Sequence, residues 1–423
     1  MKFIRVFTNP DRCMQRLGFL KHLVWKASQS ATNNLSSLGK ELVAAVSKKV
    51  SVPLSPQLQK YIKTALTDHI YKNLRALASK PCDENSDKPP VHVEMQDVYL
   101  ANSHLPSRRG KLVKGDWRKY PYLALDLGLL RKGTYSLMVR GQSFLSLVSE
   151  EEKKAFSGTM VIAVKGDLNP IELNMPQRLL LLFSIIGSDG DVLYRLYRRL
   201  LLLSQPFTDR EAGDYLPEIY RSIAKESRPR TRSGDDLSRI QKLLDTADKI
   251  EAWRGKPYSG KGARELAITP RLEPFVDLGI LSKPDPFAYR YQITDATKTF
   301  FESVINSNSI DQFLHHSFFD ASNKAFALNG KHDADRETIL TQIQKAYTVL
   351  KSPLGYVPIL EAALLAGIYS LTETGTYFEL NESVEALKRL QKERPELVRF
   401  NVDRWGALTF VKFNGDIMKV AEA

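Results

Sequence analysis

The sequence Asp126-Leu-Gly-Leu-Leu-Arg-Lys132 returns 151 residues later as Asp277-Leu-Gly-Ile-Leu-Ser-Lys283. Five of the seven positions are identical, and a sixth exchanges Leu for Ile. The similarity continues downstream, after an insertion of five residues in the second copy. Tyr135, Leu137, Phe144, Leu145 and Val148 of the first copy correspond in order to Tyr291, Ile293, Phe300, Phe301 and Val304 of the second. A chain that carries the same helix end, hairpin and helix twice is predicted to contain two copies of one small module.

The glycine in each copy predicts where a helix ends. Gly128 and Gly279 each follow an apolar stretch, and glycine is the residue that most easily adopts the positive φ found just after a helix. The leucines on either side are expected to pack against neighbouring helices. The repeat therefore predicts the fold, and residues with a binding or catalytic role are expected among the polar residues around it.

Composition narrows the class of protein. The chain has 423 residues, 43% of them hydrophobic and 26% charged, which is typical of a soluble protein with two to four domains. The longest apolar run, 179–186, is too short to span a bilayer. The two cysteines, Cys13 and Cys82, exclude a disulfide framework and a cysteine-built zinc site. We expect an intracellular protein, such as a cytoplasmic one of bacteria or archaea.

The net charge of +13 is concentrated at one end of the chain. Residues 1–80 hold 14 Lys and Arg against three acidic residues, whereas residues 241–423 hold 23 against 24. Such a concentration favours a polyanionic partner, with nucleic acid ahead of an anionic membrane.

The pattern of helices, strands and polar loops divides the chain into regions. They are a basic helical region at 1–80, the first module at 91–156, a helical linker domain at 170–253, the second module at 254–306 and a helical C-terminal domain at 310–423. Within the last region, 398–402 and 407–413 alternate as paired strands do. A helix at 382–392 precedes them, so this region is predicted to contain a third, divergent module without the heptapeptide.

A helix that ends in Leu-Gly-Leu-Leu, followed by a hairpin whose second strand reads Tyr-x-Leu or Tyr-x-Ile, resembles the winged-helix form of the helix-turn-helix fold. The resemblance covers about 117–155 and 262–305, and 355–413 more weakly. It implies a mainly α fold with small β-hairpins (α+β), in which two to three winged-helix units are joined by helical segments. It also implies DNA binding, with the helix before the hairpin in the major groove and the hairpin, or wing, on phosphates.

The candidate DNA contacts are cations around the first two modules. In the first module they precede and open a helix, whose N-terminus already attracts anions, so a ligand explains them better than helix stability does. The candidates are Arg108, Arg109, Lys111, Lys114, Arg118, Lys119, Arg131, Lys132 and Arg140 in the first module, and Lys261, Arg264, Arg271, Lys283 and Arg290 in the second. A solvated basic surface is the alternative, especially in the second module, where Glu265, Glu273 and Asp285 dilute the charge.

The third unit is expected to pack against protein. Arg399 and Arg404 flank its hairpin, but Glu379, Glu382 and Glu385 lie beside its helix.

Three motifs fall short of a catalytic or metal site. The segment 255–262 resembles a phosphate-binding loop, but Gly262 replaces the hydroxyl residue that would bind magnesium. His315 and His316, with His332 and Asp333, lack a regular ligand spacing. The acid-x-Lys string within 150–154 would need to lie on a strand to serve a nuclease, and it is predicted to be helical. We therefore expect no cofactor, no metal and no enzymatic activity.

The sequence thus predicts a non-enzymatic protein that binds double-stranded DNA. We expect a subunit of a larger DNA-processing assembly, such as a bacterial defence, antiviral or plasmid-maintenance system, with protein partners or further copies of itself and no membrane partner. One alternative is a tandem winged-helix scaffold that docks onto an ATPase complex. A second is a metal-dependent nuclease whose site would include Glu151 or Lys153.

Overall fold

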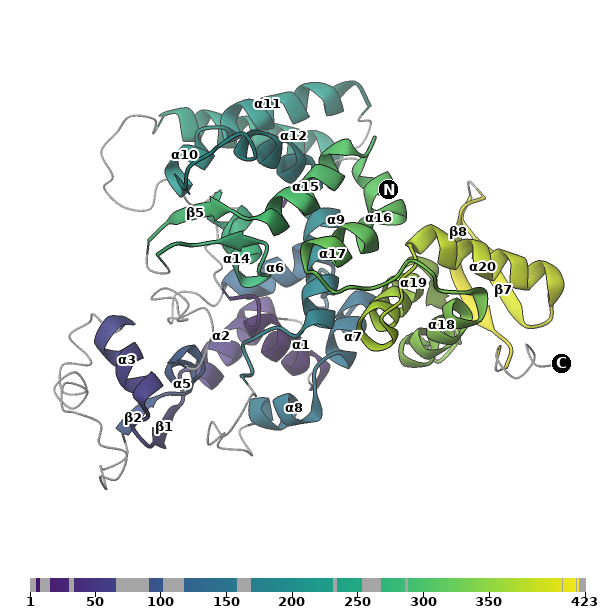
Figure 1. The fold of residues 1–423 in the computed structure, drawn as a ribbon, viewed down its shortest axis with the longest axis horizontal. Coiled ribbons are helices and arrows are strands. Elements are labelled where there is room, and N and C mark those ends of the chain that lie inside the picture. Colours follow the sequence, from purple (N-terminus) through teal and green to yellow (C-terminus); the bar gives the residue numbers. More distant parts are fainter. Residues whose placement is uncertain are drawn as a thin grey trace.

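The computed structural model describes residues 5–7, 16–29, 34–65, 91–101, 118–157, 169–230, 234–252, 268–285 and 288–417, with Trp405 and Asp416 excepted. Over these ranges the protein is mainly helical and has three small antiparallel sheets (Figure 1). This confirms the predicted class of a mainly α fold with small β-hairpins. Within the same ranges, none of the helices combines the length and the apolar character needed to cross a bilayer.

The N-terminal region supplies short helices and a two-stranded sheet. Its elements are α1 (Phe19–Gln29), α2 (Leu35–Val46), β1 (Lys49–Val52), α3 (Pro56–Ala65), β2 (Val91–Glu94) and α5 (Met95–Ala101). The hydroxyl of Ser55 accepts a 3.1 Å hydrogen bond from the Leu58 amide and so caps α3, as a Ser-Pro helix start predicts. The predicted continuation of this helix to about residue 78 lies outside the described residues.

The first copy of the repeat joins α6 (Lys119–Asp126) to α7 (Val139–Ser146) and α8 (Glu150–Ser157). Gly128 has a φ of 72°, as its position after the helix predicts. The sequence predicts a strand over 134–139, after a turn at Gly133, but the structure has only one bridge there, between Leu130 and Leu137. The reason is local, because Gly133 and Tyr135 both have positive φ (96° and 49°) and interrupt the extended chain.

The sequence predicts one apolar helix from Pro176 to Ile186 and a second from Asp191. The structure instead has one helix of 26 residues, α9 (Met175–Leu200). Two glycines near its middle do not break it, because tertiary contacts hold the chain helical there. A Cβ on Gly190 would lie 2.9 Å from the side chain of Ile310, so Gly190 allows close packing. Asp189, beside it, is fully buried in an ion pair.

The second copy of the repeat builds a three-stranded sheet. After α9 the chain forms β3 (Phe207–Thr208), α10 (Asp209–Gly213), α11 (Leu216–Ser227), the short turn η3 (Arg228–Arg230) and α12 (Gly234–Ala252). The repeat itself adds η4 (Thr269–Arg271), α14 (Glu273–Asp277), β4 (Leu281–Ser282), β5 (Arg290–Ile293) and α15 (Asp295–Asn306). The strand order is β3-β5-β4. Because Phe207 pairs with Tyr291, the sheet extends into the region that the sequence assigned to a linker domain.

The C-terminal unit follows α16 (Ile310–His316) and α17 (Phe318–Ala325). It consists of α18 (Arg336–Leu350), β6 (Val357–Pro358), α19 (Ile359–Tyr369), the π-helical turn η5 (Ser370–Thr374), α20 (Leu380–Glu393), β7 (Val398–Val402) and β8 (Leu408–Phe413). The hairpin expected at 398–413 is present, and its sheet has the order β6-β8-β7. Figure 1 shows this unit as an arm, coloured yellow-green to yellow, that projects from the rest of the molecule.

The described residues form two hydrophobic cores, and α19 contributes residues to both of them. One continuous core contains residues of both copies of the repeat, among them Leu127, Phe144, Leu278 and Phe300. A second, smaller core lies within the C-terminal unit and includes Ile343, Leu387 and Val411. The two copies of the repeat therefore form one body, and the C-terminal unit is attached to it.

Candidate nucleic-acid interface

The helix before the second hairpin is buried along its whole length. Every residue from Ile268 to Leu278 is buried, so η4 and α14 present no exposed face in this structure. The candidate Arg271 is completely buried. Its guanidinium binds both carboxylate oxygens of Asp189, at 2.6 and 2.9 Å, and donates a 2.9 Å hydrogen bond to the Tyr220 hydroxyl. Arg271 therefore holds α9, α11 and η4 together, and its burial removes it from any DNA-contacting set.

The electrostatics of this pair agree with a structural role. Burial raises the pKa of the Asp189 carboxyl, and the guanidinium of Arg271 and the backbone amide of Phe7, at 2.9 Å, offset that effect in part. Burial also raises the pKa of the Tyr220 hydroxyl. These groups are enclosed on every side, which leaves no room for a duplex.

The remaining candidates of the second module divide between the interior and the surface. Lys283 donates a 2.9 Å hydrogen bond to Glu273 and is 8% exposed. The carboxylate of Glu273 also accepts a 2.7 Å hydrogen bond from Tyr291, so Lys283 belongs to an internal network of the hairpin. Arg290 is exposed at the start of β5.

Two of the second-module candidates, Lys261 and Arg264, lie outside the described residues.

In the first module the exposed candidates are at the hairpin. Arg131 and Lys132 both lie on the surface after Leu130. Arg140 instead binds Glu361 of α19 at 2.6 and 3.2 Å, and so it connects the body to the C-terminal unit. Of the cluster that precedes α6, Arg118 is exposed and Lys119 is half-buried.

The other members of that cluster, Arg108, Arg109, Lys111 and Lys114, lie outside the described residues.

The clearest exposed set of cations is one that sequence reasoning missed. It lies on the second half of α20, where Lys392 follows Arg389 by three residues and Lys388 by four, the spacings at which helical side chains are neighbours. Lys388 is paired with Glu385 at 2.7 Å. Within the described part of the chain, Arg389 and Lys392 have no carboxylate within ion-pair distance, and both are exposed.

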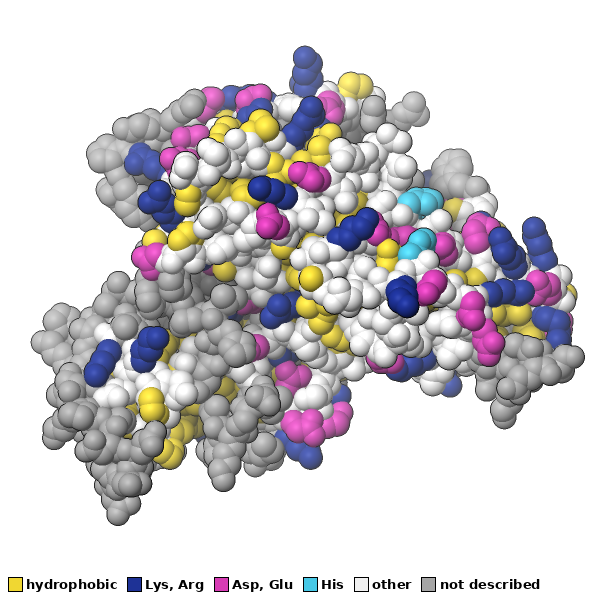
Figure 2. All heavy atoms as spheres, in the orientation of Figure 1, with side chains coloured by type: hydrophobic (Ala, Val, Ile, Leu, Met, Phe, Trp, Pro, Cys, Tyr) yellow, Lys and Arg dark blue, Asp and Glu magenta, His cyan; other side chains and the backbone are white. Residues whose placement is uncertain are grey.

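The hairpin that follows α20 extends the positive charge. Residues 388–412 contain seven Lys or Arg and three Asp or Glu, a net charge of +4. Arg399 on β7 is exposed. Figure 2 shows Lys and Arg side chains gathered toward the right-hand end of the molecule, over the C-terminal arm, with acidic side chains beside them.

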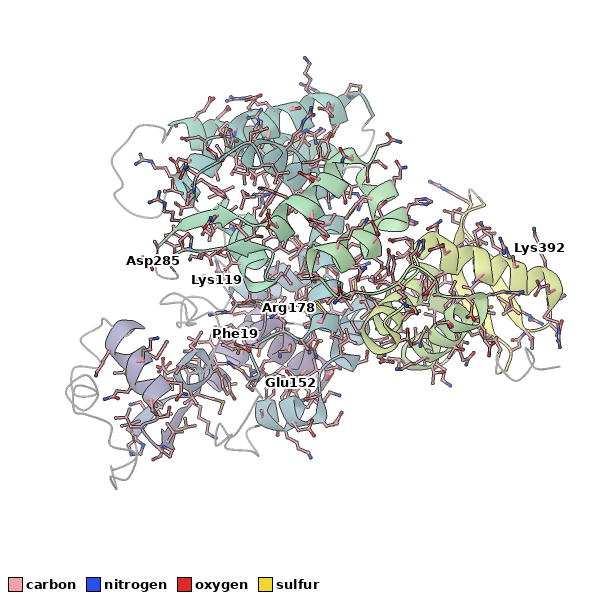
Figure 3. The ribbon with its side chains drawn as sticks, viewed as in Figure 1. Phe19, Lys119, Glu152, Arg178, Asp285 and Lys392 are labelled. Atoms are coloured by element: carbon pink, nitrogen blue, oxygen red, sulfur yellow. The ribbon has the colours of Figure 1, made fainter. Side chains whose placement is uncertain are left out.

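The opposite end of α20 is acidic and is bound to the body. Glu379, which precedes α20, accepts hydrogen bonds from the backbone amides of Phe319 and Asp320 at 3.1 and 2.8 Å. Glu382 pairs with His332 at 2.9 Å. These contacts fix the acidic end of α20 within the protein itself. Figure 3 shows Lys392 at the far end of the arm, away from the body.

The order of charges along α20 explains why the sequence did not point to these three cations. Acidic and basic residues alternate closely enough in the sequence for their charges to seem balanced. In space, Glu379 and Glu382 lie at the end of α20 that contacts Phe319, Asp320 and His332, whereas Lys388, Arg389 and Lys392 lie on its second half, which ends with Glu393. A count restricted to 388–412 would have revealed this separation.

The possible metal and nuclease motifs of the sequence do not form a recognisable site among the described residues. In the described ranges, no group of three His, Cys, Asp or Glu residues is arranged to hold a metal ion. Lys153 pairs with Glu150 at 2.7 Å on the surface of α8, and Glu151 is exposed. The segment 255–262 lies outside the described residues.

Comparison with known proteins gives no relative of this chain. No family model, curated protein or solved structure matches it.

Proposed function

We propose that this protein binds double-stranded DNA and that α20, with the β7–β8 hairpin, is a principal contact surface. The architecture supports the proposal. In the C-terminal unit the chain runs helix, strand, helix, helix, strand, strand, and the first strand pairs with the last. The second copy of the repeat has the same strand order, with β3 in the place of β6. We propose that this order of elements forms a winged helix, in which α20 would be the groove-binding helix and the hairpin the wing.

The observation that carries the proposal is that Arg389 and Lys392 are exposed and that neither lies within ion-pair distance of a carboxylate in the described part of the chain. Cations near a helix C-terminus contribute favourably to the helix, but that interaction needs no cluster that continues onto the neighbouring hairpin. An extended positive surface of net charge +4 over 388–412 fits a phosphate backbone. Arg131 and Lys132 of the first hairpin are proposed as secondary contacts, together with the sequence-predicted cluster at 108–119.

In this proposal the two copies of the repeat serve a different purpose from the C-terminal unit. Their shared core and the burial of α14 make them a rigid platform. The platform presents the first hairpin and the C-terminal unit in a fixed relation. We propose that the protein acts as a non-enzymatic subunit of a larger DNA-processing assembly, which the size of this platform would suit.

The test is a titration of the full-length protein with a fluorescent duplex at several salt concentrations. The variant carries Lys388→Gln, Arg389→Gln and Lys392→Gln, because Gln removes the charge and keeps a good helix former. Affinity should fall, and the slope of log K against log salt should decrease by roughly 2–3, since each lost phosphate contact contributes about 0.9.

The matched control removes three exposed cations from the body, Arg198→Gln, Lys225→Gln and Lys298→Gln, all on the surface of α9, α11 and α15. It changes the net charge by the same amount and should bind nearly as the native protein does. Equal losses in both variants would show that only overall charge matters and would overturn the assignment to α20. Unchanged binding in the α20 variant would do the same.

A further inference from the structure

The sheet of the C-terminal unit has an outer face that faces solvent. Its inner face is formed by buried residues such as Val398, Val411 and Phe413. Because side chains alternate along a strand, the residues between them point outward. Direct partners across β7 and β8 are Arg399 with Lys412, and Asn401 with Phe410. Opposite residues share one face of an antiparallel sheet, so these four side chains form two adjacent rows.

The third strand extends both rows. Pro358 on β6 pairs with Phe410, and the ammonium of Lys412 lies 5.4 Å from the centre of the Tyr356 ring. One row is therefore Arg399, Lys412 and Tyr356, and the row beside it is Asn401, Phe410 and Pro358. Two residues along a strand correspond to about 7 Å, so a cationic row and an aromatic row run side by side.

The exposure of Phe410 is unusual for its position. Its side chain is 40% exposed on the central strand of the sheet, where no described element covers it. Both cations beside it lack a carboxylate within ion-pair distance in the part of the chain that the structure describes. Neither row contains an acidic residue. The face thus offers an aromatic ring, a half-buried tyrosine, two positive charges and an amide.

We infer that this outer face binds single-stranded DNA, with an unpaired base stacked on Phe410 and the backbone phosphates against Arg399 and Lys412. An aromatic ring that stands on a sheet between cations suits a strand whose bases are exposed, because every base has a face that can stack. In a duplex the bases are already stacked on each other and cannot reach Phe410. Asn401 has the amide donors and acceptor that could bind a base edge.

The face shares the cations of the β7–β8 hairpin with the surface assigned to duplex binding, but the aromatic row of Asn401, Phe410 and Pro358 belongs to this face alone. The helix α20 packs on the inner side of the sheet, where Leu387 and Leu390 belong to the same core as Val398 and Val411. The choice of DNA over RNA rests on the proposed function, whereas the stacking geometry stands independently of it. Together the two surfaces would let one unit hold a junction between duplex and single strand.

The experiment measures binding of the full-length protein to a fluorescent oligothymidine strand and, in parallel, to a duplex. The Phe410→Leu variant keeps the apolar area but loses the aromatic ring, and Phe410→Trp keeps a ring. We expect Phe410→Leu to bind the single strand roughly tenfold more weakly, in the range found when a stacking residue is removed. Its affinity for duplex should fall much less, because the variant retains every positive charge of the hairpin. Phe410→Trp should bind the single strand at least as well as the native protein.

The control variant is Leu202→Ala, since Leu202 is 83% exposed on the body and its loss should alter neither affinity. Thermal unfolding of each variant shows that the fold is retained. Equal affinity of Phe410→Leu and native protein for the single strand would overturn the inference. So would dimerisation that depends on Phe410, or stronger binding to oligouridine than to oligothymidine.

The two proposals fail separately in this design. A failure of the duplex proposal alone would leave duplex binding unaffected by the α20 variant, while the Phe410 variants still changed single-strand binding. A failure of the single-strand proposal alone would leave single-strand binding unaffected by the Phe410 variants, while the α20 variant still weakened duplex binding.

Discussion

Asp277 accepts a 2.6 Å hydrogen bond from the backbone amide of Leu17, although 260 residues separate the two in the sequence. Its counterpart in the first copy of the repeat is Asp126, whose carbonyl accepts a 2.7 Å hydrogen bond from the Ser188 hydroxyl. Leu17 lies two residues before the start of α1, which packs against α6, and Ser188 lies on α9, which packs against α15. The first position of each heptapeptide therefore contacts the other copy's half of the molecule.

The contact at Asp277 should contribute strongly to stability. Its carboxylate also binds the guanidinium of the buried Arg16 at 3.1 Å, and two guanidinium nitrogens of Arg16 have no other partner among the described residues. Replacing Asp277 with Ala would leave this cation buried without a counter-charge. We expect the free energy of unfolding to fall by about 3–5 kcal/mol in urea denaturation. The double variant Arg16→Met, Asp277→Asn should recover part of that loss, and a single variant as stable as the native protein would contradict the prediction.

Stability should depend on pH through Glu379. Burial raises the pKa of its carboxyl from about 4.5 to about 7, although the amides of Phe319 and Asp320 lower it. The folded state therefore binds this proton more tightly than the unfolded chain. The free energy of unfolding should decrease as pH rises from about 4.5 to about 7, by on the order of 3 kcal/mol at most.

Glu379→Gln cannot ionise and should show a smaller decrease between pH 5 and pH 8, measured by chemical denaturation. His332 needs its own control, because the hydrogen bond to Glu382 raises the pKa of its imidazole and its contribution is also lost as pH rises. The comparison is best made in a His332→Gln background. An identical pH dependence with and without Glu379 would refute the assignment.

Arg271 should matter for folding and not for DNA. Arg271→Met leaves Asp189 buried and unpaired, so we expect a loss of about 3–5 kcal/mol in the free energy of unfolding. At a temperature where the variant is still folded, its affinity for duplex should equal that of the native protein. A specific loss of duplex affinity in the folded variant, measured by fluorescence titration, would contradict this prediction and indicate that Arg271 contributes to DNA binding.

The two repeat glycines should differ in their tolerance of a side chain. Gly128 and Gly279 have φ values of 72° and 79°, where an L-residue costs roughly 1–2 kcal/mol. A Cβ on Gly128 would meet no atom within 4 Å, whereas one on Gly279 would lie 3.3 Å from Arg178. We expect Gly279→Ala to destabilise more than Gly128→Ala in thermal unfolding. Gly128→Asn should be the mildest change, since Asn tolerates this conformation.

The first hairpin offers a test of the secondary contact. Arg131→Gln with Lys132→Gln removes two exposed charges from a turn and should leave the unfolding temperature unchanged. If the proposed DNA binding includes this hairpin, the salt slope of duplex affinity should decrease by about 2. Arg198→Gln with Lys225→Gln is the control of equal charge, and an equal effect in the two pairs would exclude a specific role for the hairpin.

Local features of the sequence predicted local structure well. The positive φ of Gly128 and Gly279, the cap at Ser55 and the hairpin at 398–413 each depend on residues within a few positions of each other. Such features follow from backbone sterics and hydrogen bonding alone, and therefore a single sequence contains the information needed.

Features that depend on distant residues were not predictable in the same way. The continuity of α9 at Gly190 depends on Ile310, and the burial of Arg271 depends on Asp189, which lies 82 residues away. The sequence around a Lys or Arg does not show whether its side chain forms an internal ion pair or lies on the surface. The same ambiguity concealed Lys392, since its exposure follows from the orientation of the whole C-terminal unit.

The distribution of charge along α20 has a consequence for how the molecule meets a partner. With Glu382 and Glu385 in the first half of α20 and Lys388, Arg389 and Lys392 in the second, the helix carries side-chain charges of opposite sign separated along its axis. A dipole turns in the field of an approaching polyanion before any contact forms. The second half of α20 would then arrive first, so ionic strength should govern the orientation and speed of encounter as well as the strength of the final complex.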